Sequence, residues 1–212
     1  MKSLEAIKTL NDVSAHQRGM FTSAQARRLG VERYTLARLE KGGSVERVAR
    51  GVYRMGGAPG VRDGDVYAAW LSLVPDREPG VPRAIERTPV AMGATSAWLQ
   101  ELGEIGPEPL EFCCGERKQT QREGIAIHKR LLDDADVVYV AGMPATSPER
   151  TVLDLIDGDE DLSLVAGVLR DALARGLVAD AEGLASEVDR RGGKAGLPHG
   201  ASLYELLMKG RR

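Results

Sequence analysis

The side chains in this sequence that come closest to a catalytic pattern resemble the signature of metal-dependent nucleases. In such sites a Pro-Asp pair supplies one acid, and a later Glu-x-Lys supplies a second acid and a lysine on one face of a strand. Pro75-Asp76 and Glu116-Arg117-Lys118 can be aligned with this signature. The later trio, however, follows Gly115 in the polar stretch GERKQTQREG, where no strand holds the two side chains on one face. We therefore expect no nuclease centre.

Other reactive side chains also lack the partners that catalysis requires. His128 lies on an expected strand, IAIHKR, and no Ser or Cys nucleophile motif accompanies it. The acids of residues 133–136 precede another expected strand and are typical of a solvated turn. Cys113 and Cys114 are adjacent, so on a strand they point to opposite faces, which disfavours a disulfide or a zinc cluster. RMGGAPG lacks the lysine and the following helix of a phosphate-binding loop. We expect no catalytic residue, no metal site and no cofactor, and therefore a protein that is not an enzyme.

Composition is that of a globular protein, with 42% hydrophobic and 28% charged residues. The 212 residues can bury a substantial core and leave room for one domain and a smaller one. No apolar run approaches the roughly 18 residues of a membrane span, and residues 1–20 lack the apolar segment of a signal peptide. We expect a cytoplasmic protein without a membrane partner.

Charge is distributed unevenly along the chain. Residues 1–56 contain eleven Lys/Arg and five Asp/Glu, a net charge of +6. The remaining residues contain 18 basic and 26 acidic side chains, a net charge of −8. A basic segment beside an acidic remainder indicates two functions, with a polyanion such as DNA as the partner of the first.

Two helices are expected at the start of the basic segment. Residues 3–19 carry apolar side chains every third position, which predicts an amphipathic helix ended by Gly19. Its apolar positions are Leu4, Ile7, Leu10 and Val13. A second helix should follow, with Thr22 as its N-cap and Gly30 just after its end.

A third helix, within residues 32–43, has the pattern of a DNA-recognition helix. Leu36 and Leu39 define its buried side at 100° per residue. The opposite side carries a stripe of Tyr34, Arg38 and Lys41, flanked by Arg33 and Thr35. Arginine can reach guanine or phosphate, and tyrosine can reach phosphate or sugar. Together with the tight Gly-containing turn before it, this helix predicts a helix-turn-helix.

A β-hairpin over residues 45–55 is expected where a wing would lie. We expect a three-residue loop, Ala49-Arg50-Gly51, in which Gly51 has a positive φ. That register places Glu46 opposite Arg54, a favourable cross-strand pair, and leaves Arg50 at the tip. A two-residue loop would instead place Arg47 opposite Arg54. An arginine at the tip suits a phosphate or a narrow minor groove.

The expected DNA-contacting residues therefore come from the second helix, the third helix and the wing. They are Thr22, Ser23, Arg33, Tyr34, Thr35, Arg38, Lys41, Arg47 and Arg50.

The rest of the chain has a mixed α/β pattern, so we expect an α+β protein with domains at 1–56 and 57–212. A helix over 66–74 should lead into an exposed Pro-rich loop, 75–89, and a helix N-capped by Thr95 or Ser96 should follow. Strands are expected in PLEFCC, GIAIHKR and DVVYVAG. A helix should begin after Ser147 with Pro148 at its first position. Further helices are expected near 161–175, 180–191 and 201–209.

The segment from residue 19 to residue 55 resembles the N-terminal winged helix of AbiEi-type antitoxins. That family has Gly-x-(Leu/Phe)-Thr-x-x-(Gln/Glu)-Ala, a Gly-Val turn, and Arg-x-x-Arg-Gly-x-Tyr. The matching residues are Gly19, Phe21, Thr22, Gln25, Ala26, Gly30, Val31, Arg47, Arg50, Gly51 and Tyr53. GATSAWLQELG (93–103) and GMPATSPERTVLDLI (142–156) are similar to the family's second domain.

The resemblance implies the antitoxin of a type IV toxin–antitoxin, or abortive-infection, operon. Such a protein represses its own promoter, double-stranded DNA with inverted repeats, and counteracts a nucleotidyltransferase toxin with or without direct contact. A dimer on DNA is compatible with it. Similar proteins with an additional nuclease-like domain exist, and we do not expect that domain here. Two alternatives remain open: a metal-dependent nuclease-like enzyme delivered to DNA by the winged helix, and a plain transcriptional regulator.

Overall fold

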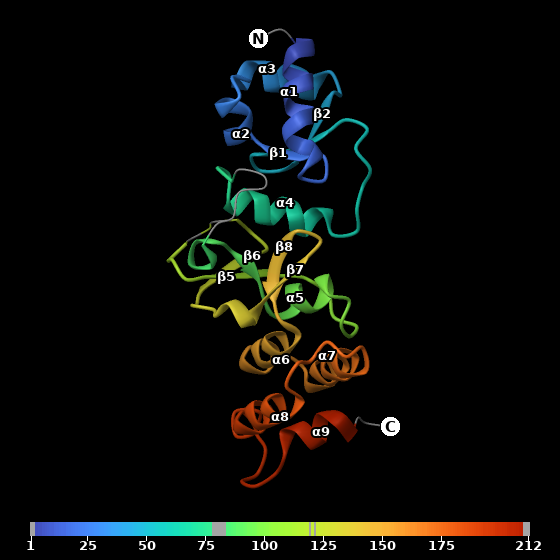
Figure 1. The fold of residues 1–212 in the computed structure, drawn as a ribbon, viewed down its shortest axis with the longest axis vertical. Coiled ribbons are helices and arrows are strands. Elements are labelled where there is room, and N and C mark those ends of the chain that lie inside the picture. Colours follow the sequence, from blue (N-terminus) through green and yellow to red (C-terminus); the bar gives the residue numbers. More distant parts are fainter. Residues whose placement is uncertain (1–2, 78–83, 119, 121, 210–212) are drawn as a thin grey trace. The chain divides into compact units, whose positions relative to one another are not determined.

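The computed structural model describes residues 3–77, 84–118, 120 and 122–209. The chain divides into two compact units, Met1–Ala84 and Ile85–Arg212 (Figure 1). Each unit combines helices with a β-sheet of its own, which confirms the α+β fold class.

The N-terminal unit is a winged helix-turn-helix. Its elements are α1 (Ser3–Ala15), β1 (Met20–Thr22), α2 (Ser23–Arg28), α3 (Arg33–Lys41), β2 (Val45–Ala49), β3 (Val52–Met55) and α4 (Gly64–Leu73). The three strands form an antiparallel sheet in the order β1-β3-β2. β1 has no separate signal in the sequence, because three residues are too few to show an alternation.

The predicted apolar side of α1 is confirmed except at Leu4. Ala6 and Leu10 are fully buried, and Ile7 and Val13 pack against the same core, whereas Leu4 is 80% exposed. Residues at spacings of three are 300° apart on a helix, so a run of four such residues turns through half the circumference, and Leu4 at its start lies outside the buried face. The helix also ends at Ala15, and the chain then turns through Arg18 and Gly19 with φ of 57° and 75°.

The predicted boundaries of α2 and α3 are confirmed. Thr22 caps α2 by accepting a hydrogen bond from Gln25 N–H over 3.0 Å. Gly30 follows the end of α2 with φ of 79°, and Gly42 is the C-cap of α3. These caps satisfy backbone groups that each helix end would otherwise leave unpaired.

The hairpin of the wing has a shorter loop than expected. Glu46 does face Arg54, and a 2.8 Å ion pair joins them. Ala49, however, faces Val52, so the predicted three-residue loop is wrong and only Arg50-Gly51 connects the strands. A β-bulge in β2 absorbs the extra residue. The prediction assumed an unbroken ladder, in which a two-residue loop would have placed two arginines opposite each other.

Helix α4 belongs to the N-terminal unit, whereas the expected boundary after residue 56 placed it in the second domain. Tyr67, Trp70 and Leu71 of α4 are buried. Arg18 lies over the Tyr67 ring at 4.4 Å and forms a 2.6 Å ion pair with Asp63. An apolar helix contacting all three strands of the small sheet completes the core of this unit.

The C-terminal unit combines a mixed five-stranded sheet with five α-helices and two short 3-10 helices among the described residues. Its elements are η1 (Ile85–Arg87), β4 (Val90–Ala91), α5 (Gly93–Leu99), β5 (Leu110–Cys114), β6 (Ile125–Lys129), η2 (Asp134–Asp136), β7 (Val137–Val140), β8 (Met143–Thr146), α6 (Pro148–Asp157), α7 (Leu162–Ala174), α8 (Ala181–Arg190) and α9 (Leu203–Lys209). The strand order is β6-β5-β4-β8-β7. Figure 1 shows α6 to α9 gathered into a helical layer, whose apolar faces form the largest core of this unit.

Most predicted elements of this unit are confirmed, and the start of α5 is corrected. α5 begins at Gly93 with Met92 as its N-cap, so Thr95 and Ser96 lie inside the helix. Both side chains are fully buried and bond to tertiary partners instead of the helix start. The short strands β4 and β8 had no signal of their own. Of the expected exposed loop 75–89, residues 78–83 lie outside the described residues, and Thr88 is buried.

The sequence motifs at residues 93–103 and 142–156 meet in one buried polar cluster of this unit. Ser96 Oγ lies 2.9 Å from Thr151 Oγ1, which lies 2.8 Å from Thr146 Oγ1. The Gln100 amide donates to Thr146 C=O over 3.0 Å and to Ser96 Oγ over 2.9 Å. This cluster joins α5, β8 and α6, so these motif residues hold the fold together.

No helix in the described part of the chain is both long and apolar enough to cross a lipid bilayer. The same residues contain no group of three or more His, Cys, Asp and Glu side chains arranged to hold a metal ion. Cys113 and Cys114 are both buried as free thiols.

Candidate DNA-binding surface

The core of the N-terminal unit fixes which side of α3 faces outward. Leu36 and Leu39 are each 4% exposed and pack with Phe21 of β1 and Val45 of β2 in one apolar cluster. Tyr34 on the opposite side is 76% exposed. The predicted division of α3 into a buried and an exposed side is therefore confirmed.

The exposed side of α3 presents a group of polar side chains. Arg38 lies 6.0 Å from the Tyr34 ring centre, close enough for a cation–π contact. Its guanidinium also donates to Ser3 Oγ of α1 over 2.5 Å. Arg33 and Lys41 are exposed at the two ends of the helix, and Thr35 is half-buried. The structure thus brings the α3 residues of the predicted site onto one surface.

The wing places its arginines at and beside a tight turn. Arg50 and Gly51 form the tip, where Gly51 has φ of 78°. Gly51 C=O accepts a hydrogen bond from Ser23 N–H over 2.8 Å, which ties the tip to the start of α2. Ser23 is exposed beside it, and Arg47 is exposed on β2. This backbone hydrogen bond therefore holds Ser23 of α2 next to Arg50 at the tip of the wing.

Several of these cations have no carboxylate partner. Within the described residues no ion pair involves Arg33, Lys41, Arg47 or Arg50. Arg54 is different, because Glu46 neutralises it. Cations without a partner can bind phosphate without first breaking an internal pair.

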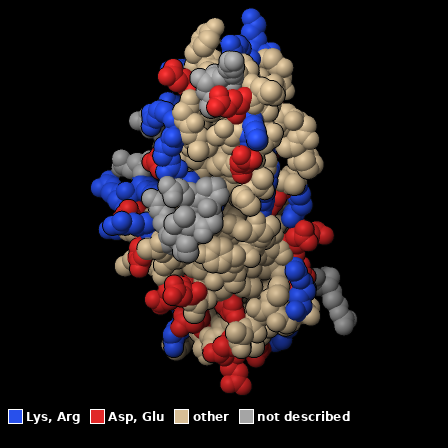
Figure 2. Space-filling view, turned by 45° about the horizontal axis from the view of Figure 1, so that its top comes forward, with Lys and Arg blue, Asp and Glu red and all other residues tan. Residues whose placement is uncertain are grey.

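Charge remains divided between the units at the observed boundary. Residues 1–84 contain 14 basic and 9 acidic side chains, a net charge of +5. Residues 85–212 contain 15 basic and 22 acidic side chains, a net charge of −7. Figure 2 shows both signs on the visible face, with acidic side chains gathered on the helical part of the C-terminal unit. The charge asymmetry therefore follows the folded units.

Thr22 is the exception among the predicted contacts. It is fully buried, and its hydroxyl donates to Pro75 C=O over 2.6 Å while accepting from Gln25 N–H. Its hydrogen-bonding capacity is used inside the fold, so it does not lie on the candidate DNA-binding surface. Thr22 is the N-cap of α2, as predicted, but its side chain faces the core.

A buried amide network behind this surface was not anticipated. Thr22 N–H donates to Gln25 Oε1 over 2.7 Å, which completes a capping box. The Gln25 amide donates to Gln17 Oε1 over 3.0 Å and to Arg77 C=O over 2.6 Å. Gln25 thereby links α2 to the segment after α4. The spacing Thr-x-x-Gln was a visible signal for the capping box, but the link to Arg77 requires the tertiary structure.

The candidate catalytic residues of the C-terminal unit have structural partners. Glu116 lies in the loop after β5, outside the strand, as the sequence indicated, and its carboxylate forms a 2.9 Å ion pair with Arg87. His128 Nε2 lies 3.2 Å from Oε1 of Glu111 on the neighbouring strand β5. The acids at 133–136 form a capped 3-10 turn.

A buried carboxylate joins the sheet to α6. Asp154 accepts hydrogen bonds from Arg130, just after β6, and from Arg150 one turn earlier in α6. Burial raises the pKa of the Asp154 carboxyl, and the two arginines oppose this shift. Burial likewise raises the pKa of Cys113 to about 12, so its thiol is protonated and unreactive at neutral pH. Both groups are buried inside the C-terminal unit, Asp154 beside two arginines and Cys113 in an apolar cluster with Val90 and Met92.

Comparison with known proteins supports the reading of the N-terminal unit. Residues 8–56 match the family model described as "Transcriptional regulator, AbiEi antitoxin", which confirms the predicted resemblance for this segment. No curated protein matches the sequence. Among solved structures, the crystal structure of the RV2827C protein from Mycobacterium tuberculosis is similar with a TM-score of 0.49 and 14% sequence identity. That likeness covers 96% of this chain and 80% of the other.

Proposed function

We propose that this chain is the DNA-binding antitoxin of a type IV toxin–antitoxin operon. The proposal is supported by the match of residues 8–56 to the family model of AbiEi antitoxins and transcriptional regulators. The N-terminal unit of the chain binds the promoter of that operon and represses it. The whole protein counteracts a nucleotidyltransferase toxin. One observation carries the DNA-binding part: exposed cations without carboxylate partners lie on both α3 and the wing of a winged helix-turn-helix.

The different roles of α3 and the wing on DNA follow from where their arginines lie. Arg38 projects from the exposed side of α3, where a recognition helix reads base edges in the major groove. Arg50 lies at the tip of a turn, where an arginine can enter a narrow minor groove or contact phosphate. Arg33, Lys41 and Arg47 supply further charge toward the backbone.

The strength of the electrostatic contribution can be calculated. Four cations, Arg33, Lys41, Arg47 and Arg50, each neutralising one phosphate, give a slope of about −3.6 for log K against log salt concentration. Raising salt from about 50 to about 200 mM should then weaken binding by about 150-fold.

A fluorescence-anisotropy titration of the full chain against its promoter at several salt concentrations tests this. Each of Arg33→Ala, Lys41→Ala and Arg47→Ala should reduce the steepness of the slope by about 0.9. Arg170→Ala, an exposed arginine on α7 of the acidic unit, is the control and should leave the slope unchanged. A wild-type slope shallower than about −2 would contradict the assignment of these cations to phosphate contacts.

Neutralisation of the toxin requires a separate test, because repression alone also lowers toxin levels. We propose that the acidic C-terminal unit is required for neutralisation. A double variant, Arg38→Ala with Arg50→Ala, should lose promoter binding yet still rescue growth when toxin and antitoxin are both expressed from foreign promoters. Rescue that disappears with promoter binding would contradict this division. A variant that represses normally but never rescues growth against the adjacent gene's product would identify a transcriptional regulator without antitoxin activity.

A further inference from the structure

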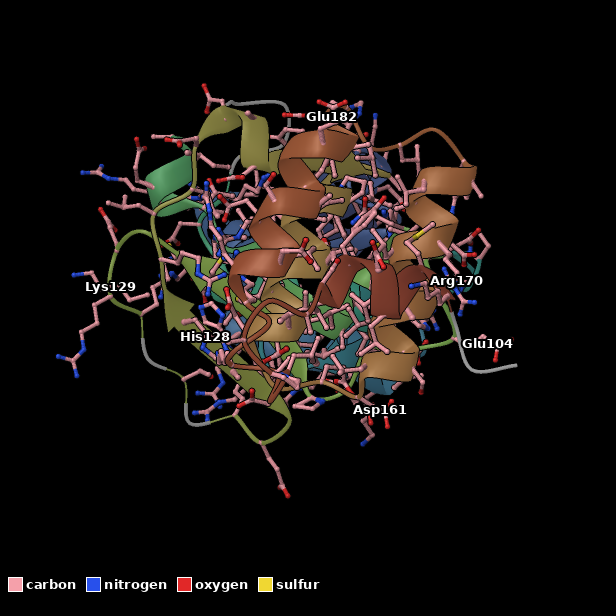
Figure 3. All side chains as sticks on the ribbon, turned by 90° about the horizontal axis from the view of Figure 1, so that it is seen from below. Glu104, His128, Lys129, Asp161, Arg170 and Glu182 are labelled. Carbon is pink, nitrogen blue, oxygen red and sulfur yellow. The ribbon has the colours of Figure 1, made fainter. Side chains whose placement is uncertain are left out.

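The two edges of the five-stranded sheet differ in how they are protected. At one edge, β6 ends in His128 and Lys129, followed by Arg130. Figure 3 shows His128 and Lys129 to one side of the helical layer. Charged side chains on an edge strand oppose pairing with another strand. At the other edge, β7 has the sequence VVYV from Val137 to Val140 and carries no charge.

The ladder between β7 and β8 shows which backbone groups face away from the sheet. Ser147 N–H donates to Asp136 C=O over 2.7 Å, which marks a hydrogen-bonded pair of this antiparallel ladder. Such pairs alternate with non-hydrogen-bonded ones. Tyr139 and Pro144 therefore form a non-hydrogen-bonded pair, as a proline requires. The N–H and C=O of Tyr139 point outward, and no described residue bonds to them.

A groove runs beside this edge on the face of Val138 and Val140, and Tyr139 between them also contributes to its lining. It has a volume of about 530 Å³, and Leu99, Val138, Val140 and Leu177 give it an apolar lining. Tyr139 itself is 67% exposed on the other face. An incoming strand would find hydrogen-bonding groups at the edge and apolar surface on both sides of it.

We propose that β7 is a self-association site, at which two copies of this chain pair their β7 strands antiparallel about a two-fold axis beside Tyr139. Each Tyr139 N–H then donates to the Tyr139 C=O of the other copy, and the two sheets become one continuous sheet. The two tyrosine side chains meet on one face. The Val138 and Val140 side chains of both copies meet on the other, next to the two grooves.

A second copy fits this edge because the surface is complementary to itself. Among the described residues that line the groove, two are charged, Glu101 and Arg175, and their charges balance. Arg175 is held there by hydrogen bonds to the C=O groups of Gln100 and Glu101 over 2.9 and 3.0 Å. The charges of the groove therefore do not oppose a second copy, although the unit has a net charge of −7. A two-fold pairing also covers the β7 edge of each of the two copies, so association stops at the dimer.

Dimerisation through β7 would supply two DNA-binding units per particle, which suits an operator of inverted repeats. The proposal does not depend on DNA binding, since it concerns the free protein. Its test therefore needs no DNA, and its failure would leave the proposed function of the N-terminal unit untouched.

Position-specific crosslinking tests the register. In Tyr139→Cys the two introduced thiols of a dimer lie opposite each other, and dibromobimane, which bridges neighbouring thiols, should crosslink the full chain in high yield. Leu131→Cys is the control, because Leu131 is 73% exposed in the same unit but lies outside β7. Cys113 and Cys114 are buried and should contribute little background. Equal crosslinking of the two variants, or none with Tyr139→Cys, would overturn the proposal.

Sedimentation equilibrium from low micromolar to submillimolar concentration tests the association itself. The wild-type mass should rise toward that of a dimer, and Tyr139→Phe should behave in the same way. Tyr139→Pro removes the outward N–H but no bond of the β7–β8 ladder, so it should fold, as circular dichroism will show, and remain monomeric. Tyr139→Lys should also remain monomeric.

Three outcomes would overturn the proposal. The wild-type chain could be monomeric throughout this range. A dimer could form that tolerates both Tyr139→Pro and Tyr139→Lys, which would place the interface elsewhere. Lastly, a monomeric chain whose Tyr139 amide becomes protected from hydrogen exchange only when purified cognate toxin is added would assign the edge to another polypeptide.

Discussion

Replacing Gln25 with alanine tests whether a residue of the family-like motif stabilises the fold rather than contacting DNA. The Gln25 side chain is 2% exposed and accepts from Thr22 N–H over 2.7 Å. It also donates to Arg77 C=O over 2.6 Å and exchanges hydrogen bonds with the Gln17 amide over 3.0 and 3.2 Å. Thr22 N–H and the Gln17 amide would lose a bond at a buried site. Arg77 C=O would lose one at a half-buried site, where Arg28 Nη2 also donates to it over 3.5 Å, so its loss is small.

The expected destabilisation follows from those three partners. Each buried polar group left without a partner costs about 1–3 kcal/mol. Gln17 can reorient toward Met20 C=O, which its amide already contacts at 3.3 Å, so its loss lies at the low end of that range. We expect Gln25→Ala to lower the free energy of unfolding of the N-terminal unit by about 3–5 kcal/mol. That is a large share of the roughly 5–15 kcal/mol typical of a domain.

The two tryptophans of the chain allow each unit to be followed separately. Trp70 lies in α4 of the N-terminal unit, and Trp98 lies in α5 of the C-terminal unit. In a Trp98→Phe background, urea unfolding monitored by fluorescence reports on the N-terminal unit. Its midpoint should fall in Gln25→Ala, whereas Trp98 fluorescence in a Trp70→Phe background should show the C-terminal unit unchanged.

Arg27→Ala is the matched control on the same helix, because Arg27 is exposed. It should change the free energy of unfolding by no more than about 0.5 kcal/mol. A loss below about 1 kcal/mol in Gln25→Ala would refute the argument that this network holds α2 to the segment after α4. Promoter binding by Gln25→Ala, measured where the unit remains folded, should stay near the wild-type value.

Three further predictions follow from other parts of the structure. Arg38→Ala should cost about 1–3 kcal/mol of promoter binding and relax base preference at one position, whereas Arg50→Ala should weaken binding on all sequences with a similar groove width; a gel-shift series on single-base operator variants separates the two, and identical profiles would contradict the assigned roles. Cys113, with its pKa raised from 9.0 to about 12, should react with iodoacetamide at pH 8.5 about 1000-fold more slowly than in the urea-unfolded chain, and fast native labelling found by peptide mass spectrometry would contradict its burial. Gly19→Ala should destabilise the N-terminal unit by about 1–3 kcal/mol more than Gly30→Ala, because both glycines have positive φ but only at Gly19 would a Cβ meet another atom, at 2.5 Å; equal midpoints in thermal unfolding would show that this contact relaxes freely.

Local sequence determined the features that depend on neighbours along the chain. Thr22 and Gly30 define α2 because a hydroxyl cap and a glycine with positive φ act within one turn of the helix. The two sides of α3 follow from Leu36 and Leu39, since one helical period fixes their direction. The Glu46–Arg54 pair follows from cross-strand chemistry. The basic character of the first unit could be counted directly.

Tertiary structure decided the features that depend on packing between distant residues. Thr22 faces inward because Pro75 C=O lies next to its hydroxyl, 53 positions later in the chain. Leu4 is exposed because Ala6 and Leu10 occupy the contact with the core. α4 joins the first unit because its apolar side chains fill that core, and no local signal says which domain an apolar helix completes. The outward direction of the Tyr139 N–H and C=O likewise depends on the strand that pairs with β7. That partner is set by the strand order of the folded sheet.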